Sequence, residues 1–514
     1  MVNFVCYTKE RLSIRNMGVV IRQSIKGTIV NYVGVLLGVF VQFFIVTKYL
    51  DPEVIGLTKV VYEVALLCSS FALLGSGSAG MRFFPYFRDE DKSKHNNGFF
   101  FFFLLLPTVG CTLMSVVYTL CKNPIESFFG KNSALFADFS HWVLPLMVIL
   151  TFWQFFETYC NINLRIVIPK AVREVGMRAL MLVLYLLYGF NVIDIAGLVG
   201  GMVLCYGLCL LATGAYAMRT GDHSLKHDWK FIDPELRSRI LKYEAFIVVA
   251  AISGNIMNQL DLFMLSSVRG LYSGGVYTIV LYIAAVVDMP TRSITAISSP
   301  LAARSLKEGN FEEANSLYKK VSVHQLLASS LLLLLIWINL DSLFSIIPNG
   351  DKFAEGRYAI LFLGLTKVIN SAIGFGNTLI SFSRYYYWTL FITLFLTILT
   401  ICTNLYFIPL YGLSGAALAT LITCLVSGTY QQYLVQRKVH GNPFTKEHLK
   451  IALTVALLYG LSLLIPSMSG ISVWLDLVVR SGAVAIAGGI LIYMLKISPQ
   501  INGAIDSFLL KLKI

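Results

Sequence analysis

Charged residues are scarce in this 514-residue sequence, at 13% against 56% hydrophobic residues. Soluble globular domains carry about 25% charged residues, so that class is excluded. Long polar segments are missing as well, because about fourteen apolar stretches alternate with loops of at most about twenty residues. A helix needs about 20 apolar residues to cross roughly 30 Å of hydrocarbon. We therefore predict an all-α integral membrane protein with about fourteen transmembrane helices.

The predicted spans are approximately residues 23–47, 57–80, 98–121, 140–160, 174–192, 194–218, 243–266, 274–298, 321–347, 358–381, 386–408, 412–436, 450–468 and 471–495.

Motifs of soluble chemistry are also missing. The nine cysteines form no CxxC pair and no disulfide framework, and most lie within spans as small apolar packing residues. The sequence has no Gly-x-x-x-x-Gly-Lys-Ser/Thr loop, so this chain does not use ATP directly. Catalysis outside the membrane would need larger outer loops than these. We expect no enzyme, no cofactor and no metal centre.

Acidic residues number 28 against 41 lysines and arginines, which gives a net charge of +13. Every second loop together with both ends holds 31 of the 41 basic residues, and the intervening loops hold only 6. The positive-inside rule then places both termini in the cytoplasm. The excess charge faces anionic membrane lipid, and no nucleic-acid partner is expected. No cleavable signal peptide is apparent, and Met17 is an alternative start.

A weak internal repeat relates the two halves of the chain. Gly197-Leu198-Val199-Gly200-Gly201 recurs as Gly412-Leu413-Ser414-Gly415-Ala416, and the run at 55–58 resembles that at 274–277. The two offsets are similar, so spans 1–6 are predicted to recur in the same orientation as spans 7–12. We expect two six-helix bundles around a central cavity, plus two C-terminal helices.

The predicted division of the chain is a cytoplasmic leader at 1–22, an N-terminal bundle at 23–218, a cytoplasmic linker at 219–242, a C-terminal bundle at 243–436, and helices 13–14 with a cytoplasmic tail at 437–514.

Three segments carry a family resemblance. Tyr49-Leu50-Asp51-Pro52-Glu53-Val54-Ile55-Gly56 resembles the first outer loop of Wzx-type polysaccharide-unit flippases, although Ile55 replaces an aromatic residue. Residues 258–277 resemble their seventh span and the following loop. Ile408-Pro409-Leu410-Tyr411-Gly412-Leu413-Ser414-Gly415-Ala416-Ala417 is similar to the turn between their spans eleven and twelve. The resemblance covers about residues 18–440, and drug exporters and lipid II flippases of the wider multidrug/oligosaccharidyl-lipid/polysaccharide exporter superfamily share parts of it.

The resemblance implies a substrate and a place. Wzx-type proteins move an undecaprenyl-diphosphate-linked oligosaccharide across the bacterial inner (plasma) membrane for O-antigen, capsule or exopolysaccharide synthesis. It implies transport by alternating access, driven by H+ or Na+ or by the membrane potential. Polysaccharide polymerase machinery is a possible partner. Two alternatives remain: a multidrug or cation exporter of the same superfamily, and a membrane polysaccharide polymerase, which the short loops oppose.

Polar residues inside apolar spans mark the candidate site, because charge in a bilayer is costly and usually functional. The predicted substrate-cavity residues are Lys367, Arg292, Lys59, Asn31, Gln42, Asn370, Asn377, Arg22 and Lys26. The ion-coupling candidates are Asp261, Glu63 and Asp288.

Each candidate also has a structural interpretation. Spacings of three and four put Lys367, Asn370 and Asn377 on one helical face, which either lines a cavity or packs on another helix. Lys59 either snorkels to the outer surface or pairs with Glu63 four residues on. Asp288 and Arg292 are also four apart and flank Pro290, so they either lock a kink or meet substrate.

Four further charges have mainly structural interpretations. Asp261 is near the outer end of its span, where a cap or a loop ion pair is an alternative. Glu157 lies near the cytoplasmic face and Arg165, where we expect an interface ion pair. Asp476 and Arg480, four residues apart in span 14, lie outside the duplicated core and are left out of the mechanism.

Overall fold

The computed structural model describes residues 29–87, 98–130, 133–220, 234–385, 387–466 and 472–500, together with Asn502, Gly503 and Asp506. Within these ranges the secondary structure is helical and no strand occurs, which confirms the all-α prediction. Nine described helices are long and apolar enough to cross a bilayer, or eleven when each of two bent pairs counts as one span. The leader at 1–22 and most of the predicted linker lie outside the described residues.

Each of the fourteen predicted spans falls on a helix wherever it is described. The predicted spans 11 and 12 form one assigned helix, α18 (Tyr387–Val439), whose backbone breaks at Gly412. The predicted span 5 falls on α9 (Met177–Gly189) and the π-helical turn η4 (Val172–Gly176) before it. The predicted span 7 lies in α11 (Pro234–Arg269).

The chain divides into two compact units, residues 1–259 and 260–514, and the boundary falls inside α11. The predicted domain limits themselves stay a prediction. Besides α9, η4 and most of α11, the first unit contains the helix Ile29–Tyr49 with its π-helical turn η1 (Val41–Val46) and its last turn α2 (Thr47–Tyr49), α3 (Pro52–Ala72), α4 (Ser76–Phe87), α5 (Phe99–Gly130), α6 (Ala134–Phe139), η3 (Ser140–Trp142), α7 (Val143–Ile162), α8 (Val167–Ala171) and α10 (Ile195–Thr220).

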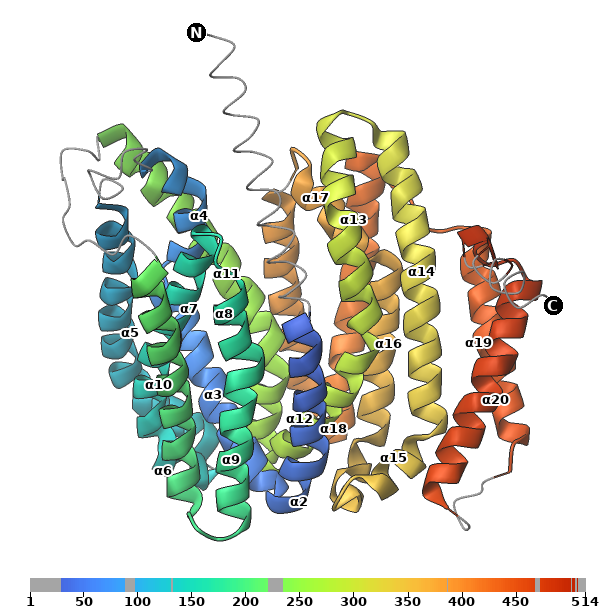
Figure 1. Ribbon diagram of the computed structural model, residues 1–514, viewed down its shortest axis with the longest axis horizontal. Helices are drawn as coiled ribbons and strands as arrows, with labels where there is room; N and C mark the ends of the chain where they lie inside the picture. The colour runs from blue at the N-terminus through green and yellow to red at the C-terminus, as the bar shows by residue number, and fades with distance from the viewer. Residues whose placement is uncertain are drawn as a thin grey trace. The chain divides into compact units, whose positions relative to one another are not determined.

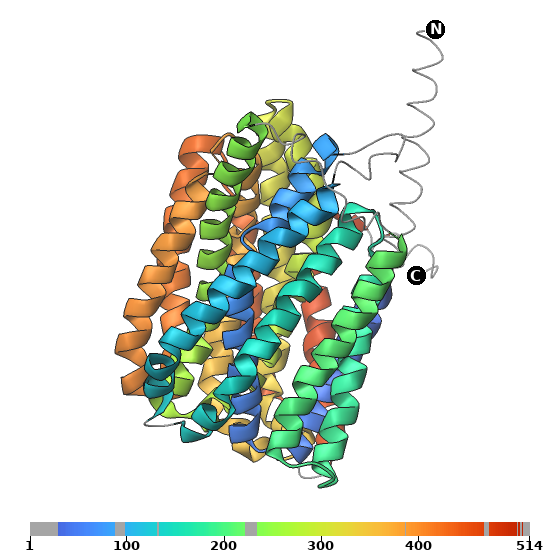
Figure 2. The same ribbon diagram turned by 90° about the vertical axis from the view of Figure 1, so that its left-hand side faces the viewer.

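Close packing holds the first unit together. Pro52 begins α3 at a position where its missing N–H is not needed. A Cβ at Gly110 of α5 would lie 1.9 Å from the carbonyl oxygen of Ala72, so only glycine permits this approach to α3. α9 and α10 pack side by side (Figure 2). Phenylalanines of α4, α5 and α7 form a buried cluster that closes one end of this unit.

The second unit follows the same all-helical pattern (Figure 1). It contains the end of α11 with α12 (Leu271–Val287), α13 (Met289–Lys307), α14 (Phe311–Ile338), α15 (Leu340–Ile346), η5 (Gly350–Gly356), α16 (Arg357–Ile373), α17 (Phe375–Phe382), α18, α19 (Lys446–Leu464) and α20 (Val473–Met494).

Three helix breaks shape this unit. α12 and α13 meet at 48° at Asp288, immediately before Pro290, so the predicted kink is present. α16 and α17 meet at 45° at Gly374. In α18, Gly412 has φ 56° and ψ −126°, which a side chain would strain. Arg269 caps this break by donating to the carbonyl oxygens of Ile408 at 3.4 Å and Pro409 at 2.6 Å.

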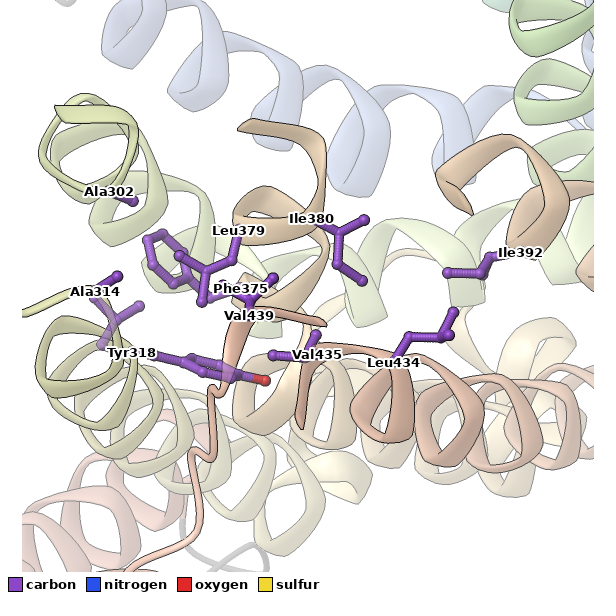
Figure 3. Close-up of a cluster of buried hydrophobic side chains, with 11 residues drawn as sticks. Ala302, Ala314, Tyr318, Phe375, Leu379, Ile380, Ile392, Leu434, Val435 and Val439 are labelled. Carbon is purple, nitrogen blue, oxygen red and sulfur yellow. The ribbon is translucent and has the colours of Figure 1, made fainter. Parts of the chain in front are cut away.

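Tyr318 anchors a buried apolar cluster that joins α13, α14, α17 and α18 (Figure 3). Its hydroxyl donates to the carbonyl oxygen of Ile373 at 2.8 Å. The C-terminal helices are fastened separately: Ser342 after α14 donates to Asp476 of α20 at 2.7 Å, and the His448 ring of α19 lies 2.9 Å from the Ser322 hydroxyl of α14. Asp476 and Arg480 therefore serve helix attachment, in agreement with their exclusion from the predicted mechanism.

Candidate functional site

A polar cluster lies inside the second unit around Asp261, in the last part of α11. Asn404 of α18 donates to Oδ1 of the carboxylate at 2.7 Å, and the Thr420 hydroxyl donates to Oδ2. These partners come from both sides of the Gly412 break, so the break brings them to one point. The alternative of a cap or loop ion pair is not what the structure shows for Asp261.

One oxygen of this cluster has no donor. Asn404 must point its amide nitrogen at the carboxylate, because an ionised carboxylate only accepts. Its Oδ1 is then buried without a hydrogen-bond partner among the described residues. The Tyr277 hydroxyl of α12 faces the same carboxylate, outside hydrogen-bonding geometry. Carboxylate, amide and hydroxyl oxygens are the ligands of a hard cation. Among the described residues, no group of three or more His, Cys, Asp or Glu side chains is placed to hold a metal ion.

Lys367 of α16 lies next to this cluster. Its ammonium is near enough for its charge to act on both Asp261 and the Cys424 thiol. The sequence offered no carboxylate partner within the lysine's own helix. The charge of Lys367 acts on Asp261 of α11, without a direct ion pair between the two. The Asn404 and Thr420 partners could not be found from sequence, because they lie more than 140 residues beyond Asp261.

The polar stripe around Lys367 is divided by the bend at Gly374. Asn370 of α16 and Asn377 of α17 are exposed, whereas Ser371 is fully buried and bonds the carbonyl of Val368. At Ser371 the polar face therefore packs against protein. Asn370 accepts a weak hydrogen bond from the Cys424 thiol at 3.4 Å.

Arg292 and Asp288 form the predicted pair, with Nε 2.8 Å from Oδ2. The arginine side chain remains 71% exposed on α13 while the carboxylate is largely covered. The pair spans the bend between α12 and α13, so it also has the geometry of the predicted kink lock.

The first unit contains a second charged cluster. Lys59 and Glu63 of α3 pair at 2.5 Å, with side chains 25% and 6% exposed. The Lys59 ammonium lies 5.3 Å from the ring centroid of Tyr62, which stacks on Tyr206 of α10 at 5.4 Å. The pairing alternative for Lys59 is therefore the one that the structure shows.

Arg173 and Arg178 join this cluster, and neither was among the predicted site residues. Arg173 of η4 donates to both oxygens of Glu157 at 2.9 Å, so Glu157 pairs with Arg173 and not with the expected Arg165. Arg178 of α9 pairs with Glu174 at 3.0 Å. The four-residue spacing of Glu174 and Arg178 was a signal for an ion pair in the sequence. The approximate span boundary at 174 concealed it.

The first helix covers Arg178. Cβ atoms at Gly34 and Gly38 would lie 2.8 and 2.9 Å from its guanidinium nitrogens, so this helix face is small where it meets the charge. Asn31 and Gln42 are partly buried on the same helix. Arg22 and Lys26 lie outside the described residues, so the structure places neither.

The fold is shared with several solved membrane proteins of low sequence identity. The chain is similar to the lipid II flippase MurJ in its inward closed conformation, with 14% identity and a TM-score of 0.70 over 92% of this chain and 99% of that one. It is also similar to an inward-facing MATE multidrug transporter, with 15% identity and a TM-score of 0.63 over 79% and 94%. These likenesses show a shared fold, and membership of the expected superfamily and the Wzx-type specificity stay predictions.

A third similar structure is a MOP superfamily transporter from Pyrococcus furiosus described as having a binding pocket of reverse polarity, with 16% identity and a TM-score of 0.56 over 82% of this chain and 95% of that one. No family model matches the sequence, and no curated protein matches it.

Proposed function

We propose that this protein is a flippase for an undecaprenyl-diphosphate-linked oligosaccharide in a bacterial inner membrane, acting by alternating access in surface polysaccharide synthesis. The observation that carries the proposal is the likeness to the lipid II flippase MurJ over 92% of the chain. That structure is described as a lipid II flippase. The charged and apolar residues described next also suit a lipid-linked substrate.

Cations within the membrane helices support an anionic headgroup. Arg292 stays 71% exposed although α13 lies in a bent helix pair long and apolar enough to span. An arginine at that depth is tolerated where it faces water or protein. Lys367 and Lys59 add positive charge on α16 and α3. These side chains, with Asn31, Gln42, Asn370 and Asn377, would meet the diphosphate and glycan.

An apolar cavity supports the lipid part of the substrate. A space of about 470 Å³ lies between α14, α16 and α19, and its walls include Leu326, Leu333, Leu365 and Val455. A hydrocarbon chain can move from the bilayer into such a cavity without being exposed to water, since leucine and lipid tails are equally apolar. A cavity of this composition suits an alkyl or polyprenyl chain better than a hydrophilic drug.

Ion coupling is assigned to Asp261. The carboxylate, the orphaned Asn404 oxygen and the Thr420 hydroxyl together offer oxygen ligands to Na+ or a proton acceptor for H+. Lys367 lies beside them, so its charge and a bound cation disfavour each other. Cation binding at Asp261 and anion binding at Lys367 would thereby be coupled.

The experiment is replacement of Lys367 in a strain that lacks the chromosomal copy. Lys367→Ala should reduce surface glycan at least tenfold at matched membrane levels, because the anionic headgroup loses a cation. Lys367→Arg should restore part of it, and Lys446→Ala, at an exposed position, should leave it unchanged. Normal surface glycan in Lys367→Ala would remove this residue from the proposed site.

The second candidate is a multidrug or cation exporter, which the MATE likeness favours. Such a protein should protect cells against cationic drugs, and its loss should not trap lipid-linked sugar units. A drug-susceptibility panel run beside a measurement of trapped undecaprenyl-linked units separates the two functions.

A further inference from the structure

The charged cluster of the first unit is open on one side at Arg173. Its Nη1 donates to both oxygens of Glu157, and the side chain remains 49% exposed. A guanidinium has five N–H donors. Its remaining donors have no hydrogen-bond partner among the described residues. The arginine is therefore held in position by a carboxylate while most of its donors face outward.

The floor beneath Arg173 is aromatic and rigid. Trp153 of α7 lies 6.0 Å from the guanidinium and is fixed by donating its indole N–H to Thr213 at 3.0 Å. Tyr206 meets Trp153 edge-on at 5.8 Å and stacks on Tyr62. Trp153 is buried, so these rings support the guanidinium from within the protein.

The charge balance of this cluster is positive. Lys59, Lys170, Arg173 and Arg178 supply four positive charges, and Glu63, Glu157 and Glu174 supply three negative ones. One further oxyanion would neutralise the cluster. Arg173 is the most exposed of the three ion-paired cations, at 49% against 33% for Arg178 and 25% for Lys59.

The backbone at Arg173 is unusual as well. η4 is a π-helical turn that carries Arg173 and Glu174, between the α-helical segments α8 and α9. Such turns in longer helices are frequent at functional sites. Here the turn directs two neighbouring charges to different helices, since Arg173 contacts α7 while Glu174 pairs within α9.

We infer that Arg173 binds an oxyanion of the transported molecule, with Glu157 as the internal carboxylate that holds the arginine in place and is released as the anion arrives. The ligand is a phosphate or a sugar carboxylate. This inference rests on the proposed transport of an acidic glycolipid and adds a subsite in the first unit, separate from Lys367.

The experiment measures binding by titration calorimetry to the purified full-length protein in phosphatidylcholine nanodiscs. Inorganic pyrophosphate and glucuronate are the two probes, and they separate a diphosphate from an acidic sugar. Arg173→Gln should weaken binding of the preferred probe at least tenfold. Glu157→Gln should bind it as well as or better than the wild type, and the double variant should behave like Arg173→Gln.

A purely structural ion pair gives another pattern: both single variants lose binding equally and the double variant recovers it. That pattern, or no binding of either probe to the wild type, would overturn the inference. Arg173→Lys keeps the positive charge but lacks the planar set of guanidinium donors. It serves as the second variant if Arg173→Gln fails to fold, and it should bind the probe two- to tenfold more weakly than the wild type. Arg357→Gln with Asp341→Asn, another cross-element pair in the second unit, is the matched control and should change nothing.

Because binding is measured without transport, this test and the flippase proposal fail independently. Probe binding that depends on Arg173 in a protein that translocates no lipid-linked sugar would sustain the subsite and reject the function. Translocation with unaltered binding in Arg173→Gln would do the reverse.

Discussion

Two carboxylates of the second unit are each held by two partners. Asp261 accepts from Asn404 and Thr420, and Asp476, 2% exposed, is held by Ser342 and Arg480. An unpaired charge in a bilayer is expensive, so such networks are the condition for keeping carboxylates there. The two networks differ in one respect that matters for function, since only the one at Asp261 adjoins a transport candidate, Lys367.

The first residue-scale prediction concerns Asp261→Asn. The amide keeps the shape and can still accept from Asn404 or Thr420, so the protein should fold, with a loss of about 1–3 kcal/mol at most from imperfect pairing. The charge is lost, and ion-dependent transport should fall at least tenfold. The measurement is translocation in proteoliposomes with and without an imposed Na+ or H+ gradient.

Asp476→Asn is the matched control for that experiment. It removes a more deeply buried carboxylate from α20 and should lower thermal stability through its lost contacts with Ser342 and Arg480. The gradient dependence should stay as in the wild type. Equal gradient dependence in Asp261→Asn and the wild type would contradict the coupling role.

At the scale of elements, the breaks in the helices position the polar groups. The Gly412 break turns α18 back so that Asn404 and Thr420 reach the same carboxylate. The bends at Asp288 and Gly374 change the helix direction along α12–α13 and α16–α17 by 48° and 45°. Backbone freed at such bends needs internal partners in a membrane, and Arg269 supplies two at the break in α18.

Gly412→Ala tests the break in α18. The nearest atoms to an added Cβ are 3.8 and 4.0 Å away, so the cost comes from the backbone conformation alone, about 1–3 kcal/mol. The apparent melting temperature of the purified protein should fall, and cation dependence should weaken because Asn404 and Thr420 shift. Gly460→Ala in α19, where nothing lies within 4 Å, is the control and should be neutral or slightly stabilising. Equal melting temperatures for the two variants would contradict this account.

Gly110→Ala tests helix packing instead of backbone conformation. The added Cβ would meet the Ala72 carbonyl oxygen at 1.9 Å, so α3 and α5 must separate. This variant should be less stable than Gly412→Ala and should reach the membrane in reduced amount. Thermal stability by size-exclusion after heating measures the effect, and wild-type behaviour would show that the two helices are less closely packed than described.

At the scale of the whole molecule, charge bias defines the expected topology. With 31 of 41 basic residues on one side, both termini should be cytoplasmic. A fluorescent protein fused after Ile514 should therefore fluoresce, and alkaline phosphatase fused there should be inactive. An active phosphatase fusion would place the C-terminus outside the cytoplasm and contradict this topology.

Much of the fold could be predicted from the sequence because apolar length and basic loops are local signals. The kink at Pro290 and the pairs Lys59–Glu63 and Asp288–Arg292 followed from spacings within one helix. Partners on other helices did not, as Asn404 with Asp261 and Glu157 with Arg173 show. No periodicity within one helix reports which neighbour it meets, and an error of a few residues at a span boundary moved Arg173 and Arg178 out of consideration.

The central claim is translocation of a lipid-linked oligosaccharide, and reconstitution tests it most directly. The full-length protein in proteoliposomes, loaded with undecaprenyl-diphosphate-linked oligosaccharide, should make the glycan in one leaflet accessible to a membrane-impermeant lectin or glycosidase from the other side. The account predicts time-dependent exchange that Lys367→Ala slows at least tenfold. Glycan accessibility that stays at the level of protein-free liposomes, together with export of a cationic drug by the same preparation, would contradict it.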